Sequence, residues 1–343
     1  MRSQFIRTWA VLALLALASG VWAQSAPATP TADSQNIATL KRQAASGDAN
    51  AQYKLGEMYA YGTSLPQDYA QAAVWFRKAA EQGNVDAQYN LGVSYQSGQG
   101  LPQDYTQAVY WYRKAADQGD TYAQNNLGAL YHRGIGVPID ETQAVYWSRK
   151  AAEQGGSKAQ ITVAVAYETG HGVPQDYAQA AIWYRKAADQ GEAVAQWRLG
   201  SLYQAGHGVP QDYAQAAIWY RKAAEQGNAD AQEMLGGLYY SGQGVLQDDR
   251  QAAVWTRKAA EQGNADSQYA LGLLYDIGRG VPQDYVEAYF WLDLAAAGKL
   301  RFLKVEEVST ARDQAASHLT PADLSSVQER ARKWFENHPA KAQ

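Results

Sequence analysis

Residues 170–191 read GHGVPQDYAQAAIWYRKAADQG, and residues 206–227 read the same 22 letters except that Glu225 replaces Asp189. The two copies lie 36 residues apart, and the same offset recovers weaker copies that begin at Gly98, Gly242 and Gly278. A fixed period of this size is typical of proteins in which short helical units stack into a solenoid. A residue that recurs in every copy is therefore predicted to hold the stack together rather than to perform chemistry.

Each 36-residue unit is predicted to contain two helices. In the first helix Ala, Leu and Tyr recur four residues apart, as in Ala195, Leu199 and Tyr203, which places them on one core-facing stripe. The second helix has Asp212 as its predicted N-cap and Gln215 three residues later, the arrangement of a capping box. A Trp on the second helix is predicted to be buried in all seven units, as Trp75, Trp111, Trp147, Trp183, Trp219, Trp255 and Trp291.

A Gly follows the core Leu of the first helix in six units, although Gly lowers helix stability by about 1 kcal/mol relative to Ala. These residues are Gly56, Gly92, Gly128, Gly200, Gly236 and Gly272. We expect the close approach of a neighbouring helix backbone to require them. A further Gly ends the first helix, and a residue such as Gly206 suits the left-handed conformation of that position.

The recurring pattern resembles the Sel1-like repeat, a relative of the tetratricopeptide repeat with a longer loop between the helices. The resemblance rests on A-x-x-x-L-G-x-x-Y-x-x-G-x-G-V-x-x-D followed by A-x-x-W-x-x-K-A-A-x-x-G, which returns seven times in phase over residues 48–299. It implies an all-α fold, a right-handed α-solenoid of about seven 36-residue helix-turn-helix repeats with terminal capping helices. The capping helices are predicted at residues 34–47 and 300–338, and residues 339–343 are predicted to be a tail.

The N-terminus has the composition of a secretory signal peptide. Arg2 and Arg7 precede an apolar run from Trp9 to Leu17, and small residues at Val21 and Ala23 predict cleavage after Ala23. An uncleaved anchor is the alternative, but the apolar run is short for a membrane span. Residues 24–33 are predicted to be a flexible leader. The mature chain is therefore expected in the periplasm or outside the cell, with no stable membrane anchor.

Composition excludes several kinds of site. The 343-residue chain has no cysteine, so it has no disulfide, no thiolate metal ligand and no Cys nucleophile. Cleavage would remove two of the 30 basic residues and leave 28 against 34 acidic ones, a net charge of −6 that gives no electrostatic reason to bind nucleic acid. No motif of a nucleotide-binding protein, zinc protease or serine hydrolase occurs. No catalytic residue, metal or cofactor is therefore predicted.

A few individual residues stand out. His171 and His207 recur one period apart, which favours a loop role over metal binding or catalysis. His132 occurs once, close to acidic residues in the sequence, and is a candidate functional residue. The recurring Arg-Lys pairs, such as Arg185-Lys186, are predicted to form a solvated basic row balanced by nearby acidic residues.

Variation between repeats is concentrated on one face of the first helices, outside the core stripe. By resemblance to such arrays, the first helices line a concave surface, and Tyr and Trp there suit a protein or peptide partner. The alternative is that these side chains only fill the space between repeats. The predicted partner-binding residues are Tyr53, Tyr89, Asn125, His132, Trp197, Gln204, Tyr240 and Tyr269.

The sequence thus predicts a non-enzymatic scaffold or adaptor for protein–protein interaction, in the periplasm or secreted. The alternative is a protein that binds cell-wall glycan or peptide, because aromatic faces also stack on sugars. A third hypothesis is hydrolysis of β-lactams, to which some Sel1-like proteins have been linked. Those proteins resemble disulfide-stapled arrays, and the absence of cysteine argues against that subclass.

Overall fold

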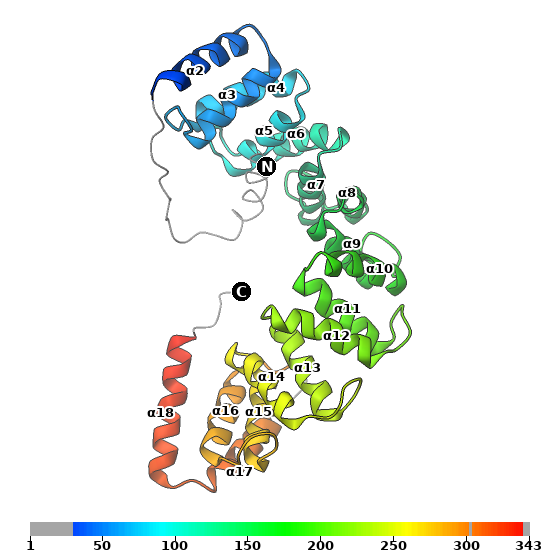
Figure 1. Cartoon of the computed structure of the whole chain (residues 1–343), viewed down its shortest axis with the longest axis vertical. Coiled ribbons are helices and arrows are strands. Elements are labelled where there is room, and N and C mark those ends of the chain that lie inside the picture. The colour runs from blue at the N-terminus through cyan, green and yellow to red at the C-terminus, as the bar shows by residue number, and fades with distance from the viewer. Residues whose placement is uncertain (1–29, 302–303, 339–343) are drawn as a thin grey trace. The chain divides into compact units, whose positions relative to one another are not determined.

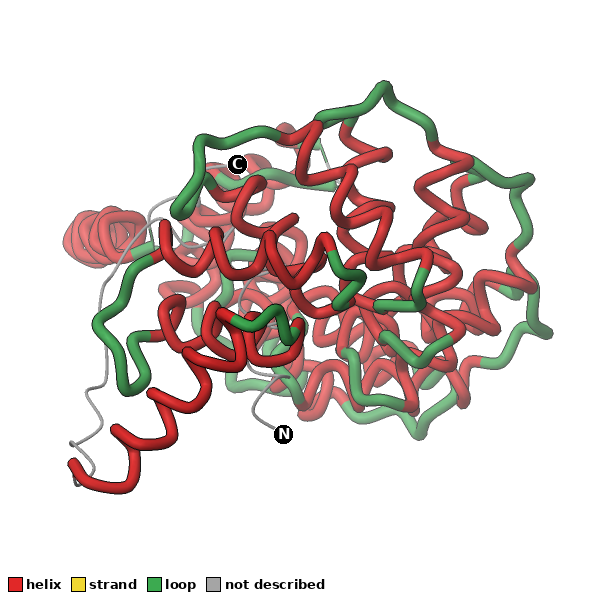
Figure 2. Tube along the Cα trace, turned by 90° about the horizontal axis from the view of Figure 1, so that it is seen from above, coloured by secondary structure: helices red, strands yellow, loops and turns green. Residues whose placement is uncertain are grey.

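A computed structural model describes residues 30–301 and 304–338 of the protein. Regular secondary structure in these ranges is α-helical, and no strand occurs in them (Figure 2). The chain divides into two compact units, residues 1–175 and 176–343, and each is described by itself. The predicted signal peptide at residues 1–23 and the tail at 339–343 lie outside the described residues, as does the leader up to residue 29.

The first unit is a run of helices that each pack against the next one along the chain (Figure 1). It begins with α2, which starts at Pro30, earlier than the start predicted at Ser34. Pairs of helices connected by a longer loop then form three complete repeats, and the unit ends with the first helix of a fourth. The bounds are α2 Pro30–Ala45, α3 Ala49–Tyr61, α4 Tyr69–Glu81, α5 Val85–Ser97, α6 Tyr105–Asp117, α7 Thr121–Arg133, α8 Glu141–Glu153 and α9 Ser157–Thr169.

The second unit continues the same alternation and ends with two helices outside the repeats. Its bounds are α10 Tyr177–Asp189, α11 Ala193–Ala205, α12 Tyr213–Glu225, α13 Ala229–Ser241, α14 Asp249–Glu261, α15 Ala265–Ile277, α16 Tyr285–Ala297, α17 Val305–Ala316 and α18 Pro321–Asn337. Thr320 caps α18 and Pro321 occupies its first turn, as the sequence predicts. Both α17 and α18 pack against α16, which they cover (Figure 1). None of the described helices combines the length and the apolar character needed to cross a membrane.

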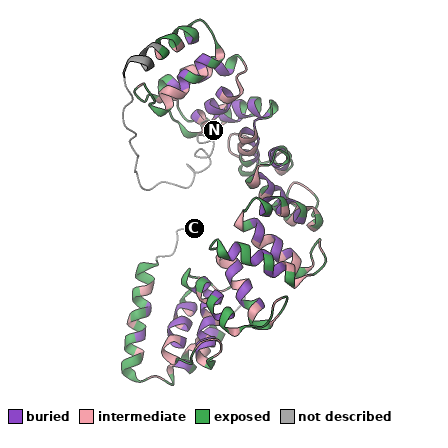
Figure 3. Cartoon of the chain, viewed as in Figure 1, coloured by how far each residue is buried: buried purple, intermediate pink, exposed green. Residues whose placement is uncertain are grey.

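The core lies where neighbouring helices face one another (Figure 3), and it consists mainly of Ala, Leu, Tyr and Trp side chains. Ala195 and Leu199 are fully buried, as the predicted stripe requires. Six of the seven recurring Trp side chains are also buried, with exposed fractions of 4–8%. Trp75 is only partly buried, and it packs against a small cluster that includes Leu40 and Leu55. The first repeat has only α2 before it, so its Trp has less surface to pack against.

The turn between the helices of a repeat is fixed by one carboxylate and by the backbone. Asp212 caps α12 as predicted, since its Oδ1 accepts hydrogen bonds of 2.9 Å from the backbone N–H groups of Ala214 and Gln215. The predicted capping box is wrong, however, because the backbone N–H of Asp212 donates to the carbonyl of Tyr203 at 2.9 Å. This bond closes the loop onto α11. Gly206 has the predicted left-handed conformation, with φ of 71°.

The glycines of the first helices make room for side chains more than for a neighbouring backbone. A Cβ on Gly200 would lie 2.7 Å from the ring of Tyr220, whereas the nearest backbone atom, the carbonyl oxygen of Ala216, would be 3.3 Å away. A Cβ on Gly92 would lie 2.7 Å from the ring of Tyr112 in the same way. The predicted close backbone approach also occurs, since a Cβ on Gly128 would lie 2.9 Å from the carbonyl oxygen of Ala144. The second helix of the same repeat therefore supplies both the side chain and the backbone that need the space.

Candidate functional site

The eight predicted partner-binding residues lie on first helices and are divided between the two units. The first unit contains Tyr53, Tyr89, Asn125 and His132, and the second contains Trp197, Gln204, Tyr240 and Tyr269. Their surroundings differ although their helical positions correspond. The two sets are therefore considered one at a time.

In the first unit, Tyr89 is fully buried, so its ring does not lie at the surface as predicted. It packs between Tyr112 and Tyr122, with ring centroids 5.8 and 6.1 Å away. Tyr53 is partly buried, and its hydroxyl donates a hydrogen bond of 2.8 Å to Glu57. Asn125 is partly buried as well. This set therefore offers less exposed aromatic surface than the sequence predicts.

His132 and His207 each have a contact within the fold, whereas His171 is exposed. His132 has a side chain that is 63% exposed, and its Nδ1 lies 3.0 Å from both carboxylate oxygens of Glu141 at the start of α8. This contact connects the two helices of the third repeat. His207 packs against Tyr177 with ring centroids 4.8 Å apart, as expected for a loop residue. Within the described ranges, no group of three or more His, Cys, Asp or Glu residues could hold a metal ion.

In the second unit, Gln204 is partly occupied by a structural contact. The hydroxyl of Tyr220 donates a hydrogen bond of 2.7 Å to Oε1 of Gln204 and lies 3.2 Å from the hydroxyl of Ser201. Burial raises the pKa of Tyr220 to about 12, so its phenol remains a protonated donor at neutral pH. The amide nitrogen of Gln204 remains the group that could contact a partner.

The aromatic residues of the second unit are more accessible than Tyr89. Tyr240 is 41% exposed, and the guanidinium of Arg279 lies 3.9 Å from its ring centroid. Arg279 is held by Asp249, with an Nε to Oδ1 distance of 2.9 Å. Trp197 and Tyr269 are each partly buried against neighbouring apolar residues. A partner would meet rigid, partly exposed rings here rather than flexible side chains.

A cluster of three carboxylates around Arg301 adjoins this face and was not predicted. Nη1 of Arg301 lies 2.6 Å from Asp230, another guanidinium nitrogen contacts Glu233, and its backbone N–H donates to Asp266 at 3.1 Å. Asn264 also donates to Glu233 at 2.8 Å. Burial raises the pKa of Glu233 above its ordinary value, because its effect is larger than that of the Asn264 hydrogen bond and the Arg301 charge, which lower the pKa. The cluster holds the chain that follows α16 against the sixth and seventh repeats.

A row of buried glutamines links each repeat to the one before it, and the sequence analysis missed it. Nε2 of Gln232 donates to the carbonyl of Ala224 at 3.0 Å, and Oε1 of Gln232 accepts from Gln262 at 2.8 Å. The signal was the Gln near the start of every first helix, which follows an Ala in six repeats and Ser267 in the seventh. The residues that donate to a carbonyl eight positions earlier are Gln52, Gln88, Gln124, Gln160, Gln196, Gln232 and Gln268.

The Arg-Lys pairs do not form a merely solvated row. The Arg donates a hydrogen bond to the hydroxyl of a Tyr on the next first helix in five repeats, which corrects the prediction for this residue. The pairs are Arg77 with Tyr95, Arg113 with Tyr131, Arg185 with Tyr203, Arg221 with Tyr239 and Arg257 with Tyr275. The Lys of each pair is exposed, as predicted. The recurring Arg therefore also connects one repeat to the next.

Comparison with known proteins agrees with this architecture. The model of the Sel1 repeat matches seven consecutive segments, residues 49–84, 85–120, 121–156, 157–192, 193–228, 229–264 and 265–299. A Sel1 repeat protein from Oxalobacter formigenes is 39% identical over 77% of this chain and 77% of its own, with a TM-score of 0.61. A protective antigen of uropathogenic Escherichia coli that displays an SLR fold is 30% identical over 90% of this chain and 98% of its own, with a TM-score of 0.45. Among curated proteins, none matches the chain.

Paired helices in a fixed period, bonded from repeat to repeat, define an all-α repeat solenoid, a type of fold that serves as a scaffold for protein–protein interaction. The chain belongs to the Sel1 repeat family, as its seven matched repeats show. The invariant residues of the repeat are used in caps, cores and links between repeats. What distinguishes this member is the set of side chains that vary from one repeat to the next.

Proposed function

We propose that the chain is a non-enzymatic scaffold that binds a protein or peptide on the first helices of its second unit. The observation that supports this proposal best is that the aromatic rings of Trp197, Tyr240 and Tyr269 are partly exposed on the face where repeats differ. Rigid aromatic rings provide large contact areas at a low entropic cost. Gln204, beside them, offers an amide group for hydrogen bonding.

We also propose that this binding takes place in the periplasm or outside the cell. The support is the signal-peptide pattern of residues 1–23. N-terminal sequencing of the protein isolated from its native host tests this part. A mature chain that begins near Gln24 is the expected result, whereas a chain that begins at Met1 would contradict it.

Cross-linking in the native cell envelope, followed by mass spectrometry, tests the binding surface. The informative variant is Trp197→Ala/Tyr240→Ala, which removes two partly exposed rings. The control is Leu246→Ser, which removes a 91% exposed apolar side chain from the loop between α13 and α14, outside the first helices. We expect the double variant to lose most cross-linked partner while the control retains it. Equal recovery of the partner by wild type and a correctly folded double variant would refute this choice of surface.

The same variants separate a protein partner from cell-wall glycan, because aromatic rings can stack on either. Purified peptidoglycan free of protein is mixed with the chain and pelleted. We expect the chain to stay in the supernatant. If it pellets, and Trp197→Ala/Tyr240→Ala does not, then the surface binds glycan or wall peptide and the proposal of a protein partner is wrong.

A further inference from the structure

Each second helix of the first six repeats exposes one large apolar side chain. This residue directly precedes the recurring Trp and is 45–48% exposed in every case. We call these residues the second-helix row: Val74, Tyr110 and Tyr146 in the first unit, and Ile182, Ile218 and Val254 in the second. Packing within the stack does not explain an apolar residue that recurs at one position and remains exposed. Exposed apolar surface of this kind is typical of interaction sites.

Positive charge lies next to the row. An exposed Lys follows each row residue by four positions, one turn further along the same helix. In the second unit, Nζ of Lys186, Lys222 and Lys258 lies 3.9, 4.1 and 4.2 Å from the indole centroid of the Trp that follows the row residue. The ammonium groups are therefore held at the edge of the apolar row.

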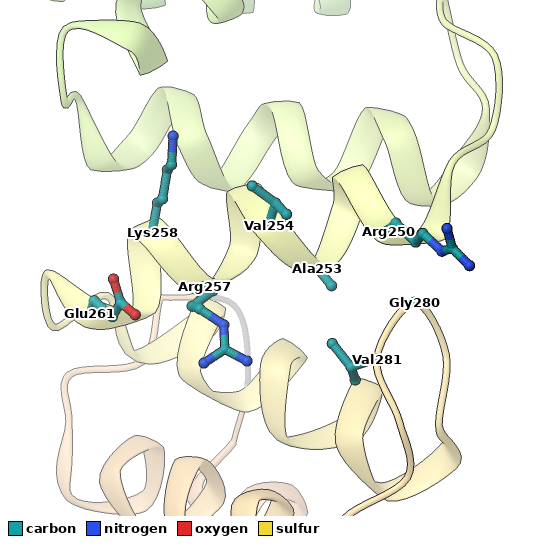
Figure 4. A pocket seen from close by; sticks show the side chains of 8 residues that line it. All are labelled: Arg250, Ala253, Val254, Arg257, Lys258, Glu261, Gly280 and Val281. Atoms are coloured by element: carbon teal, nitrogen blue, oxygen red, sulfur yellow. The ribbon is translucent and has the colours of Figure 1, made fainter.

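A depression of about 390 Å³ lies beside the last row residue of the second unit (Figure 4). Its apolar part consists of Ala253 and Val254 of α14 and Val281 of the loop between α15 and α16. Arg250 lines one end, and Arg257, Lys258 and Glu261 line the other (Figure 4), so three basic groups stand against one acidic group. An apolar side chain with a neighbouring negative charge would fit this combination of groups.

The seventh repeat shows what can cover this position. Its residue there is Phe290, which is only 2% exposed because α18 lies against it. Val327 and Ala331 of α18 belong to the same buried cluster as Phe290, and the guanidinium of Arg330 lies 3.8 Å from the Phe290 ring centroid. An amphipathic helix thus packs on the face that the other six repeats leave exposed.

The second helix of the seventh repeat is more acidic than the others at two positions, and its covering helices provide a basic partner for each. Glu287 stands where the other six second helices have Gln, and Asp293 stands where they have Arg. Arg330 of α18 pairs with Glu287 at 2.5 Å, and Arg312 of α17 pairs with Asp293 at 3.5 Å. An arginine of a covering helix therefore meets each of these two acidic residues of the repeat. Where the repeats carry Arg-Lys, the complementary helix is an acidic one.

We propose that the second-unit part of the row, Ile182, Ile218 and Val254, is a docking surface for an amphipathic helix of another protein whose apolar stripe is flanked by acidic residues. The covered Phe290 supports a helix as the occupant, and the Arg-Lys pairs support its negative charge. Arg330, the α18 residue that lies over the covered Phe290, would meet an Arg-Lys pair with like charge in the other repeats, which argues against the α18 of a second copy of the chain. This surface lies on the second helices, so the proposal does not depend on the first-helix surface proposed above.

Two peptides derived from α18 test the proposal on the full-length chain. One has the unmodified sequence of residues 320–338, and the other carries R330E, R332E and K333E, which keep the apolar stripe and reverse its flanking charges. Binding is measured by fluorescence anisotropy of the labelled peptides. We expect saturable binding of the charge-reversed peptide and at least tenfold weaker binding of the unmodified one.

Three variants of the chain locate the binding. Ile182→Ser/Ile218→Ser should weaken binding of the charge-reversed peptide at least tenfold, and its fold should be retained because Ile and Ser have similar helix propensities and both sites are exposed. Lys186→Glu/Lys222→Glu should reverse the preference and favour the unmodified peptide. Trp197→Ala on the first helices should leave binding unchanged. Circular dichroism confirms the fold of each variant.

Several results would overturn the proposal. One is the absence of saturable binding of the charge-reversed peptide, and another is equal binding by wild type and Ile182→Ser/Ile218→Ser. A peptide preference that Lys186→Glu/Lys222→Glu does not change would refute the role of charge. Finally, if phosphatidylglycerol vesicles bind through Ile182 and Ile218 while neither peptide does, the row contacts a membrane surface instead of a helix.

Discussion

The glycines inside the first helices allow a sharp test of how the two helices of one repeat pack. Gly200 and Gly237 both lie within first helices of the second unit, yet only Gly200 faces another helix. A Cβ at Gly237 would have no neighbour within 4 Å, whereas a Cβ at Gly200 would meet the buried ring of Tyr220. Gly237→Ala should therefore raise the stability of the chain, whereas Gly200→Ala should not.

The expected magnitudes follow from the contacts. Each substitution gains about 1 kcal/mol of helix propensity. At Gly200 the new Cβ would lie 2.7 and 2.8 Å from two ring carbons of Tyr220, while carbon atoms pack at about 3.5–4.0 Å. The ring cannot easily retreat, because its hydroxyl is bonded to Gln204. Overpacking of a core typically costs about 1–3 kcal/mol, so Gly200→Ala is expected to range from neutral to about 2 kcal/mol destabilising.

Urea unfolding followed by circular dichroism compares the two variants with wild type. The midpoint should rise for Gly237→Ala and stay level or fall for Gly200→Ala, with about 1–3 kcal/mol between the two variants. If Gly200→Ala is stabilised as much as Gly237→Ala, the ring of Tyr220 can move aside without a measurable cost in stability. The account of helix glycines as space for a side chain would then be wrong.

Two further predictions concern buried polar groups of the second unit. Gln232→Ala should lower the free energy of unfolding by about 1–3 kcal/mol, because it leaves the Ala224 carbonyl and the Gln262 amide without their shared partner. Gln243→Ala, at an exposed site, should change the free energy of unfolding by less than about 0.5 kcal/mol. Equal urea midpoints for the two variants would contradict this prediction. The raised pKa of Glu233 means that the folded chain holds this proton more tightly than the unfolded chain, so its contribution to stability is complete below the ordinary pKa of Glu and is lost as the pH rises through the raised pKa. Glu233→Gln should therefore gain stability relative to wild type as the pH rises from about 4 to about 7, and urea midpoints whose difference does not change with pH would refute this.

Much of the fold could be predicted from the sequence because it depends on contacts within about one period. The cap at Asp212 needs only its own side chain and the next few backbone N–H groups. The capping box failed because the backbone N–H of Asp212 bonds to Tyr203, nine residues earlier, across a loop whose path the pattern does not give. The pattern also shows that space is needed at Gly200, but it does not show that the ring of Tyr220 is the nearest group in that space.

The candidate site was harder to predict, because helical periodicity gives a direction and not an exposure. Tyr89 and Tyr269 occupy the same position in their repeats, yet Tyr89 is fully buried and Tyr269 only partly. The difference depends on neighbours that vary, such as Tyr122 in the repeat after Tyr89. Arg301 lies 68 residues after Glu233 and outside the repeats, so no periodic pattern could connect the two.

Recurrence in this chain has two physical causes that the sequence alone does not separate. Gln232 and its equivalents recur because each satisfies a buried carbonyl of the preceding helix, and burial accounts for them fully. Ile218 and its equivalents recur without burial, and they vary among Val, Tyr and Ile while remaining apolar. A contact of exact shape would not tolerate such variation, whereas burial of apolar area against a helix would. The position is covered at Phe290 and exposed in the six other repeats, which is why a docking surface explains the row better than packing within the stack does.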